Sequence, residues 1–151
     1  MSSTDSLEQL SCISIIVCDD VYRDERTKKL IIVGVFNSIA GRELPVRHPR
    51  MCVLFSITNG NGTYDLGLTI EHEATGTEIM RVNGPFEVKD PLGVYDIHVE
   101  LRGLSFPHDG KYWVTLRSGE AILQQRPFSI KMQPRDSTDA GSQRTDLNPP
   151  A

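Results

Sequence analysis

The sequence has few of the residues that identify a disulfide-stabilised or zinc-binding protein. It contains three cysteines, Cys12, Cys18 and Cys52, and no Cys-x-x-Cys pair. An odd count with this spacing predicts neither a disulfide framework nor a zinc site. We expect small buried thiols in a reducing compartment, with Cys12 and Cys18 on the same side of one strand. A bridge from Cys12 or Cys18 to Cys52 is the alternative.

Long apolar runs, a basic leader and a basic stripe are also missing. No run approaches the roughly 20 apolar residues of a membrane span, and the first residues are polar, unlike a signal peptide. The chain has 20 acidic and 16 basic side chains, a formal net charge of −4. This balance counts against nucleic acid as a partner. These absences predict a cytoplasmic protein without a membrane span.

Catalytic and cofactor motifs are absent as well. The sequence has no phosphate-binding loop, no dinucleotide fingerprint and no nucleophile elbow. Its histidines, His48, His72, His98 and His108, do not cluster in sequence. The sequence therefore predicts a protein that is not an enzyme and that carries no cofactor.

Eight segments have the β-branched composition or the period of two that is typical of strands. Turn signals such as Asn59-Gly60-Asn61-Gly62 separate them, and no segment has the period of an amphipathic helix. This pattern predicts an all-β protein, an antiparallel two-sheet β-sandwich of Greek-key type, immunoglobulin-like or jelly-roll. We expect a polar lead-in at residues 1–10, the sandwich at 11–132 and a disordered tail at 133–151. The expected strands are residues 11–21, 30–39, 51–58, 63–73, 78–82, 94–104, 112–117 and 120–132.

The segment 101–132 carries the clearest structural signal, an arch, a strand, a hairpin and a final strand. Gly110-Lys111-Tyr112 after the arch resembles a tyrosine corner, in which a buried ring bonds to backbone just upstream. If Tyr112 points inward, alternation turns Trp113 outward. Ser118-Gly119 is expected to form a two-residue hairpin loop. A bulge is expected near residues 125–127, because Pro127 cannot donate to a central ladder.

Two blocks of residues resemble a known family. The first is Cys18-Asp19-Asp20-Val21 followed by residues 29–36, and the second comprises Phe106-Pro107, Gly110, Tyr112, Gly119 and Arg126-Pro127-Phe128. Together they are similar to a bacterial β-sandwich family known only as a domain of unknown function. The similarity covers residues 11–132, and Lys28-Lys29 replaces the Gly-Lys pair typical of the first hairpin. The resemblance implies the fold and supplies no site.

Two clusters of charge are candidate sites. Asp19 and Asp20 could hold a hard cation together with a histidine, which would make the protein a metal-dependent enzyme. Successive strand residues point to opposite faces, however, so solvated or hairpin-paired carboxylates are the alternative. The segment 42–50, with Arg47 and Arg50, could bind an anion, and a solvated loop is the alternative.

Trp113 is the remaining candidate, with Lys111 and Arg117 beside it on the outward face. An outward Trp can anchor a protein interface or stack on a sugar, and the alternative is that another segment covers it. The favoured hypothesis is a non-catalytic binding or assembly module in the bacterial cytoplasm. It would contact a protein, or a second copy of itself, through an outer sheet face or an edge strand. Metal binding and carbohydrate binding are the competing hypotheses.

Overall fold

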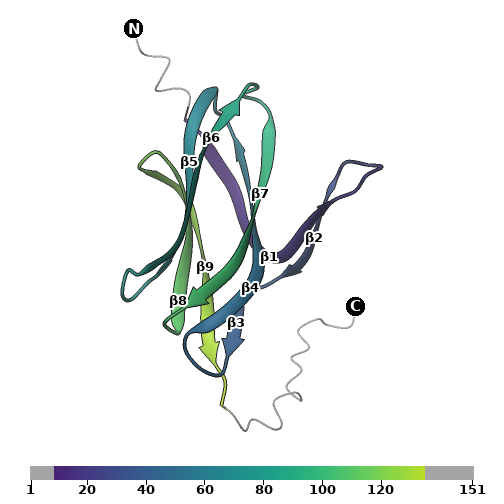
Figure 1. Cartoon of the computed structure of the whole chain (residues 1–151). Helices are drawn as coiled ribbons and strands as arrows, with labels where there is room; N and C mark the ends of the chain where they lie inside the picture. Colours follow the sequence, from purple (N-terminus) through teal and green to yellow (C-terminus); the bar gives the residue numbers. More distant parts are fainter. Residues whose placement is uncertain (1–8, 135–151) are drawn as a thin grey trace, which may run out of the picture.

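The computed structural model describes residues 9–134, which form two packed β-sheets (Figure 1). The predicted all-β sandwich is confirmed, with nine strands instead of eight. Residues 1–8 of the expected lead-in, and residues 135–151 of the expected disordered tail, lie outside the described residues. The strands are β1 (Ser11–Arg23), β2 (Leu30–Val35), β3 (Ser38–Gly41), β4 (Val46–Thr58), β5 (Gly62–His72), β6 (Glu78–Val88), β7 (Val94–Phe106), β8 (Gly110–Ser118) and β9 (Ala121–Met132).

The strands are divided between a four-stranded and a five-stranded sheet. Sheet A has the order β2-β1-β4-β7, and sheet B has the order β3-β9-β8-β5-β6. Neighbouring strands are antiparallel except for β3 and β9, which run parallel. Alternate apolar side chains from both sheets fill the space between them. At its centre the rings of Phe106, Tyr112 and Phe128 lie within 6 Å of one another, centroid to centroid.

The expected strand 30–39 is in fact two strands in different sheets. The chain leaves sheet A after β2 and enters sheet B at β3. The crossing is tied to both sheets, because Phe36 N–H donates to Val17 C=O (3.1 Å) and Asn37 C=O accepts from Ser129 N–H (3.0 Å). Gly34, with φ of +70°, lies so close to the Asp19 side chain that a Cβ would collide with it. Only glycine allows so close an approach at a positive φ without strain.

The tyrosine corner is present, and two details of the last hairpin differ from expectation. The Tyr112 hydroxyl donates to His108 C=O (2.7 Å) and accepts from His108 N–H (3.2 Å). The two-residue loop is Gly119-Glu120, because Ser118 still pairs with Ala121. The irregularity lies opposite Leu116, and Pro127 stays in the ladder. Since β3 pairs with β9 only from Ser129 onward, the missing N–H of Pro127 is tolerated.

All three cysteines are free. Cys12 and Cys18 face different sides of β1, which corrects the expectation that they share one side. The pairing of β1 with β4 shifts between Cys12 and Ser14. This irregularity reverses the side-chain phase, because strand residues alternate between faces. Cys12 therefore packs against the main core, whereas Cys18 lies with Cys52 in a separate cluster.

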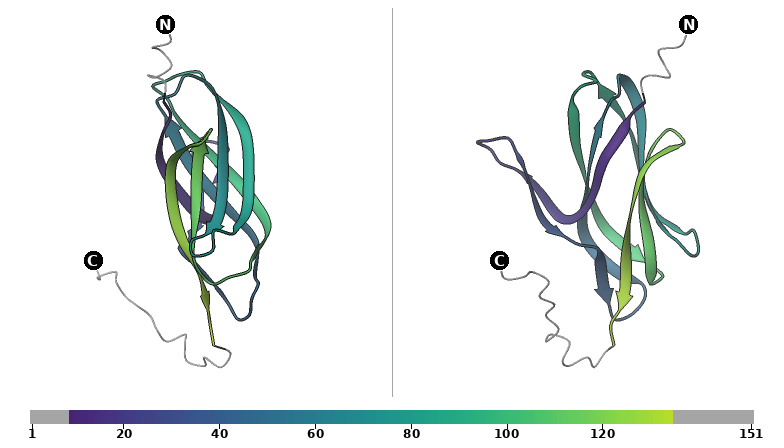
Figure 2. Two further views of the ribbon diagram at one scale, coloured as in Figure 1. Left: turned by 90° about the vertical axis from the view of Figure 1, so that its left-hand side faces the viewer. Right: turned by 180° about the vertical axis from the view of Figure 1, so that it is seen from behind.

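One hairpin projects from the sandwich. The first part of β1 pairs with β4, and from Cys18 onward β1 pairs with β2. Between these parts β1 bends sharply, so the hairpin stands away from the two sheets (Figures 1 and 2). We call residues 19–35 the arm. In residues 9–134 no helix has the length and apolar character needed to cross a membrane.

Candidate interaction site

A small apolar cluster fixes the base of the arm to the outer side of sheet A. Val21 at the start of the arm packs with Cys18, Cys52 and Leu54, all at most 7% exposed. Leu30 and Ile16 pack against the same cluster. Burial raises the pKa of the Cys18 and Cys52 thiols, so both remain protonated apolar packing groups. The arm therefore has a hydrophobic base of its own.

An arginine ties the same base to the neighbouring strands. Arg50 on β4 binds Asp20 through two parallel bonds, Nη2–Oδ1 at 2.7 Å and Nη1–Oδ2 at 2.8 Å. Its Nε also donates to Glu100 on β7 (2.5 Å), and Arg102 contacts the same carboxylate (2.6 Å). Hydrogen bonds from Arg50 hold the pKa of Asp20 well below its usual range. A bidentate pair has one preferred geometry, so it orients the arm.

The tip of the arm is ordered by one aspartate. The Asp24 carboxylate accepts from Arg26 N–H (2.7 Å) and Thr27 N–H (3.0 Å). Asp24 N–H donates to Lys29 C=O (2.8 Å), and Lys28 takes a φ of +64° to close the turn. Such side-chain bonds replace water around the turn backbone. The hairpin is thus fixed at both ends.

Between these ends, β2 exposes its apolar side chains on both faces. Ile31, Ile32, Val33 and Val35 are 46%, 37%, 43% and 55% exposed. β2 is also an edge of sheet A, so within residues 9–134 one side of its backbone has no neighbouring strand. Edge strands usually carry charge, proline or a cover that prevents pairing with another chain. β2 has none of these protections, and this combination makes it the strongest candidate interaction site in residues 9–134.

The other long edge strands are protected in the usual ways. β7 alternates its apolar residues with Asp96, His98, Glu100 and Arg102, all exposed. β6 carries Pro85 and an Arg81–Glu78 ion pair (2.8 Å). Charge and proline both discourage strand addition. The exposure of β2 is therefore specific to the arm.

An open cleft separates the arm tip from the sandwich. Arg23, Lys28 and Lys29 line one side of this cleft of about 590 Å³, and Tyr95 and Asp96 line the other. The sandwich side of the cleft also includes Phe86 of β6, so both sheets contribute to it.

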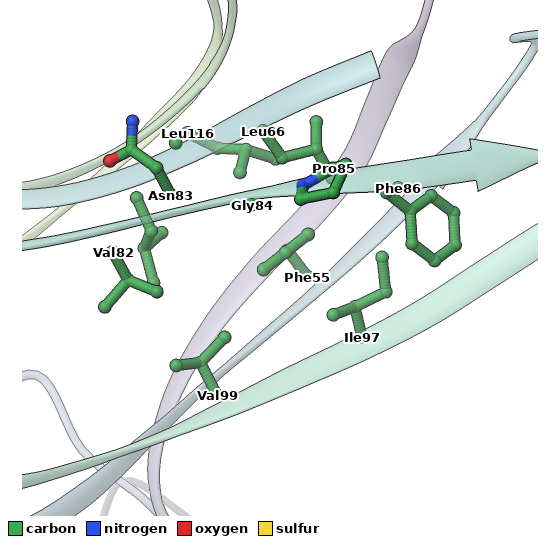
Figure 3. A pocket seen from close by; sticks show the side chains of 12 residues that line it. Phe55, Leu66, Val82, Asn83, Gly84, Pro85, Phe86, Ile97, Val99 and Leu116 are labelled. Carbon is green, nitrogen blue, oxygen red and sulfur yellow. The ribbon is translucent and has the colours of Figure 1, made fainter. Parts of the chain in front are cut away.

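A second, apolar pocket opens where β6 and β7 separate (Figure 3). Val82 and Phe86 approach it from β6, and Ile97 and Val99 approach it from β7. Its volume of about 160 Å³ is below the roughly 300–1,000 Å³ of ligand pockets. No charged side chain lines it. Its size and lining suit an incompletely closed seam between the sheets better than a substrate site.

Trp113 occupies the outer side of sheet B and is half-buried. Its Nε1 donates to a Glu73 oxygen (3.1 Å), and Lys111 Nζ lies 5.2 Å from the ring centroid. Arg117 bonds instead to Thr69 (3.1 Å). The structure thus brings Lys111 and Trp113 together, while Arg117 takes other partners. The Lys111 contact covers part of the ring that a sugar would stack on.

The other candidate charges are dispersed. Arg50 uses its guanidinium on Asp20 and Glu100, whereas Arg47, the residue before His48 on β4, is exposed. Asp19 is exposed and lies against Gly34, so the two adjacent aspartates have different surroundings. Nowhere in residues 9–134 do three His, Cys, Asp or Glu side chains form a group that could hold a metal ion. The cation and anion hypotheses gain no geometric support.

Sequence reasoning missed the exposure of β2 completely. Residues 30–35 have the composition of a buried strand, and no alternation marks a solvent face. Two signals lay nearby, the eight-residue charged connection 22–29 and Gly34. Neither reveals that β1 bends, and the partners of the arm base, Arg50 and Cys52, lie far along the chain.

Comparisons with known proteins give one match to a family and several similar solved structures. A search of curated proteins finds no match. The DNA-bound alkylpurine DNA glycosylase AlkC of Pseudomonas fluorescens and a β-glucosidase of Erythrobacter marinus are each similar with a TM-score of 0.46, at 12% and 14% identity. Both matches cover 82% of this chain, which spans only 31% and 15% of those proteins.

A third solved structure is similar over nearly its whole length. An immunoglobulin-like protein of Pseudomonas aeruginosa matches at 9% identity and a TM-score of 0.40, over 83% of this chain and 99% of that one. The family model is matched by residues 13–131, which include both sheets and the arm. The chain belongs to the family of unknown function DUF6941.

Proposed function

We propose that this protein is a non-catalytic binding module of the bacterial cytoplasm that contacts a protein through edge strand β2. The partner supplies an extended segment that continues sheet A beyond β2. Main-chain hydrogen bonds provide the affinity, and side chains on the two faces provide the specificity. Of the two surfaces expected from the sequence, an outer sheet face or an edge strand, the geometry favours the edge.

The observation that carries this proposal is the exposure of four large apolar residues on an unprotected edge. A two-stranded hairpin is only marginally stable in water by itself. Here it is fixed at the base by Arg50 and at the tip by Asp24. An arm that is already ordered loses less conformational entropy when it binds, so more of the interaction free energy appears as affinity.

Photo-crosslinking in the native host tests the proposal. A benzoylphenylalanine at Val33 (43% exposed) is compared with one at Ile122 on β9 (54% exposed), a matched apolar site outside the arm. We expect a protein adduct of discrete mass from position 33 and none from position 122. No adduct from the arm, or equal adducts from both positions, would contradict strand addition at β2.

A further inference from the structure

We propose that the partner of β2 is a second copy of this chain. The two β2 strands pair antiparallel about a two-fold axis that passes at Ile32. This inference rests on the proposed function and names its partner. Sheet A then continues through both copies as one eight-stranded sheet, because each copy contributes its four strands.

The hydrogen-bond pattern of the arm leaves the correct backbone groups at its edge. Asp24 N–H donates to Lys29 C=O, so Lys29 turns its polar groups toward β1. In an antiparallel ladder the direction alternates, which turns those of Leu30 and Ile32 outward. Val21, opposite Ile32, agrees with this phase because its N–H bonds to the Asp20 side chain (2.9 Å). Two Ile32 residues can therefore exchange a pair of N–H···O=C bonds.

The side chains of β2 suit a strand of the same composition. β2 carries no charged residue, and its exposed isoleucines and valines occupy both faces. A partner strand must be apolar at consecutive positions to cover them. The other long edges, β6 and β7, interrupt their apolar residues with charges such as Arg81 and Glu100. Among the edge strands of residues 9–134, β2 itself fits best.

The charges at the two ends of the arm are complementary in this arrangement. The tip, residues 22–29, has four basic and two acidic side chains, a net charge of +2. The base has the exposed carboxylate of Asp19 beside Gly34. Antiparallel pairing places the tip of one copy against the base of the other, which brings Lys28 and Lys29 toward Asp19 of the second copy. With the axis at Ile32, Gly34 lies opposite Leu30 of the second copy.

The shape of the molecule permits this pairing. The arm points away from the sandwich (Figures 1 and 2), and β1 is the strand that borders β2 among the described residues. The paired arms form a ribbon of four strands, the size at which a small sheet becomes independently stable. One six-residue strand contributes a small interface, so we expect a dimer with a dissociation constant on the order of micromolar.

Charge variants at the axis test the pairing. Sedimentation velocity of the full chain at concentrations from about 1 to about 100 µM covers the range around the expected dissociation constant. We expect the wild type to pass from monomer to dimer in this range. I32D should stay monomeric, because the axis sets two carboxylates against each other, and I32K should do so for the same reason. Mixed together, I32D and I32K should form a dimer again.

The control is I122D, an aspartate at an apolar site on β9 that is as exposed as β2, and it should dimerise like the wild type. A monomeric wild type, a dimeric I32D or a mixture that fails to assemble would each overturn the second-copy proposal. If Val33 crosslinks to a different protein while the purified chain stays monomeric, strand addition stands and self-pairing fails.

Discussion

Val17 and Val33 are valines in strands of the same sheet, yet Val17 is completely buried and Val33 is 43% exposed. Val17 belongs to the sandwich, where two sheets cover each other. Val33 belongs to the arm, a two-stranded ribbon that no other described strand covers. Apolar burial holds the sandwich together, whereas the arm depends on Arg50, Asp24 and a small apolar cluster. One region is built for stability, and the other keeps apolar surface available.

The largest difference should appear when one apolar side chain is truncated in each region. Phe106→Ala removes a fully buried ring that touches Tyr112 and Phe128, and should lower the free energy of unfolding by about 3–5 kcal/mol. Ile31→Ala, at 46% exposure, should change it by less than about 0.5 kcal/mol. Urea denaturation of dilute protein measures both. Similar losses would show that the arm belongs to the core.

The tyrosine corner should give the next largest effect. Tyr112→Phe keeps the ring but removes the hydroxyl that bonds to both His108 backbone groups. Leaving those groups unpaired should cost about 1–2 kcal/mol in unfolding free energy. Tyr22→Phe in the arm, at 54% exposure, removes a hydroxyl that bonds to the Asp20 side chain and not to buried backbone, and should cost less than about 0.5 kcal/mol. A Tyr112→Phe variant as stable as the wild type would mean that the hydrogen bonds of the corner contribute nothing to the free energy of unfolding.

Loss of Arg50 should loosen the arm and leave the sandwich intact. Arg50→Met removes the bidentate bond to Asp20 and the bond to Glu100. Amide hydrogen exchange of β2 should accelerate by about tenfold, because opening the arm no longer breaks this contact. Amides of β5 and β8 should keep their rates. Equal acceleration in both regions would contradict separate stabilisation of the arm.

The Asp20 contact also predicts a pH dependence. Arg50 lowers the folded pKa of Asp20 below the unfolded value of about 3.9, so its contribution is complete above that value. The contribution is lost only as the pH falls through the lower folded pKa. Carboxyl NMR should therefore show Asp20 still ionised at about pH 4 in the wild type. In Arg50→Met the pKa of Asp20 should rise toward its ordinary value and stay below it, because the Tyr22 hydroxyl and Val21 N–H still bond to the carboxylate; an unchanged titration would contradict the assignment.

Trp113→Ala should give a smaller effect than either of the two core substitutions. The ring is half-buried and makes one bond to Glu73 and one contact with Lys111, so unfolding free energy should fall by at most about 1 kcal/mol. Assembly measured by sedimentation should be unchanged, because Trp113 lies on sheet B, away from the arm. A monomeric Trp113→Ala would move the interaction site to sheet B.

Local signals in the sequence were enough to predict the sandwich. Period-two alternation located most strands, and Gly110-Lys111-Tyr112 located the corner, because both depend on neighbouring residues. The phase of β1 was wrong, since a bulge between Cys12 and Ser14 leaves no local signal. The bulge expected at Pro127 was also misplaced, because tolerance of proline depends on which neighbouring strand is present.

The candidate site could not be predicted in the same way. Leu30–Val35 reads as a buried strand, since its composition is the same whether or not a sheet covers it. β2 is exposed because the arm bends away from the sandwich, and the arm base is held by Arg50, which lies 30 residues from Asp20 in sequence. Asp19-Asp20 suggested a cation, but their nearest long-range partner is a guanidinium. Pairings of this kind depend on the tertiary fold.

The continuity of β1 has a consequence for the arm. A single uninterrupted strand carries Ile15 and Val17 in the core and, a few residues later, the inner strand of the arm. A slip of the arm by one residue would have to pass through the bend and pull those side chains onto the wrong face. The packing of Ile15 and Val17 in the sandwich therefore fixes the register of the arm, and with it the position of Ile32 along the exposed edge.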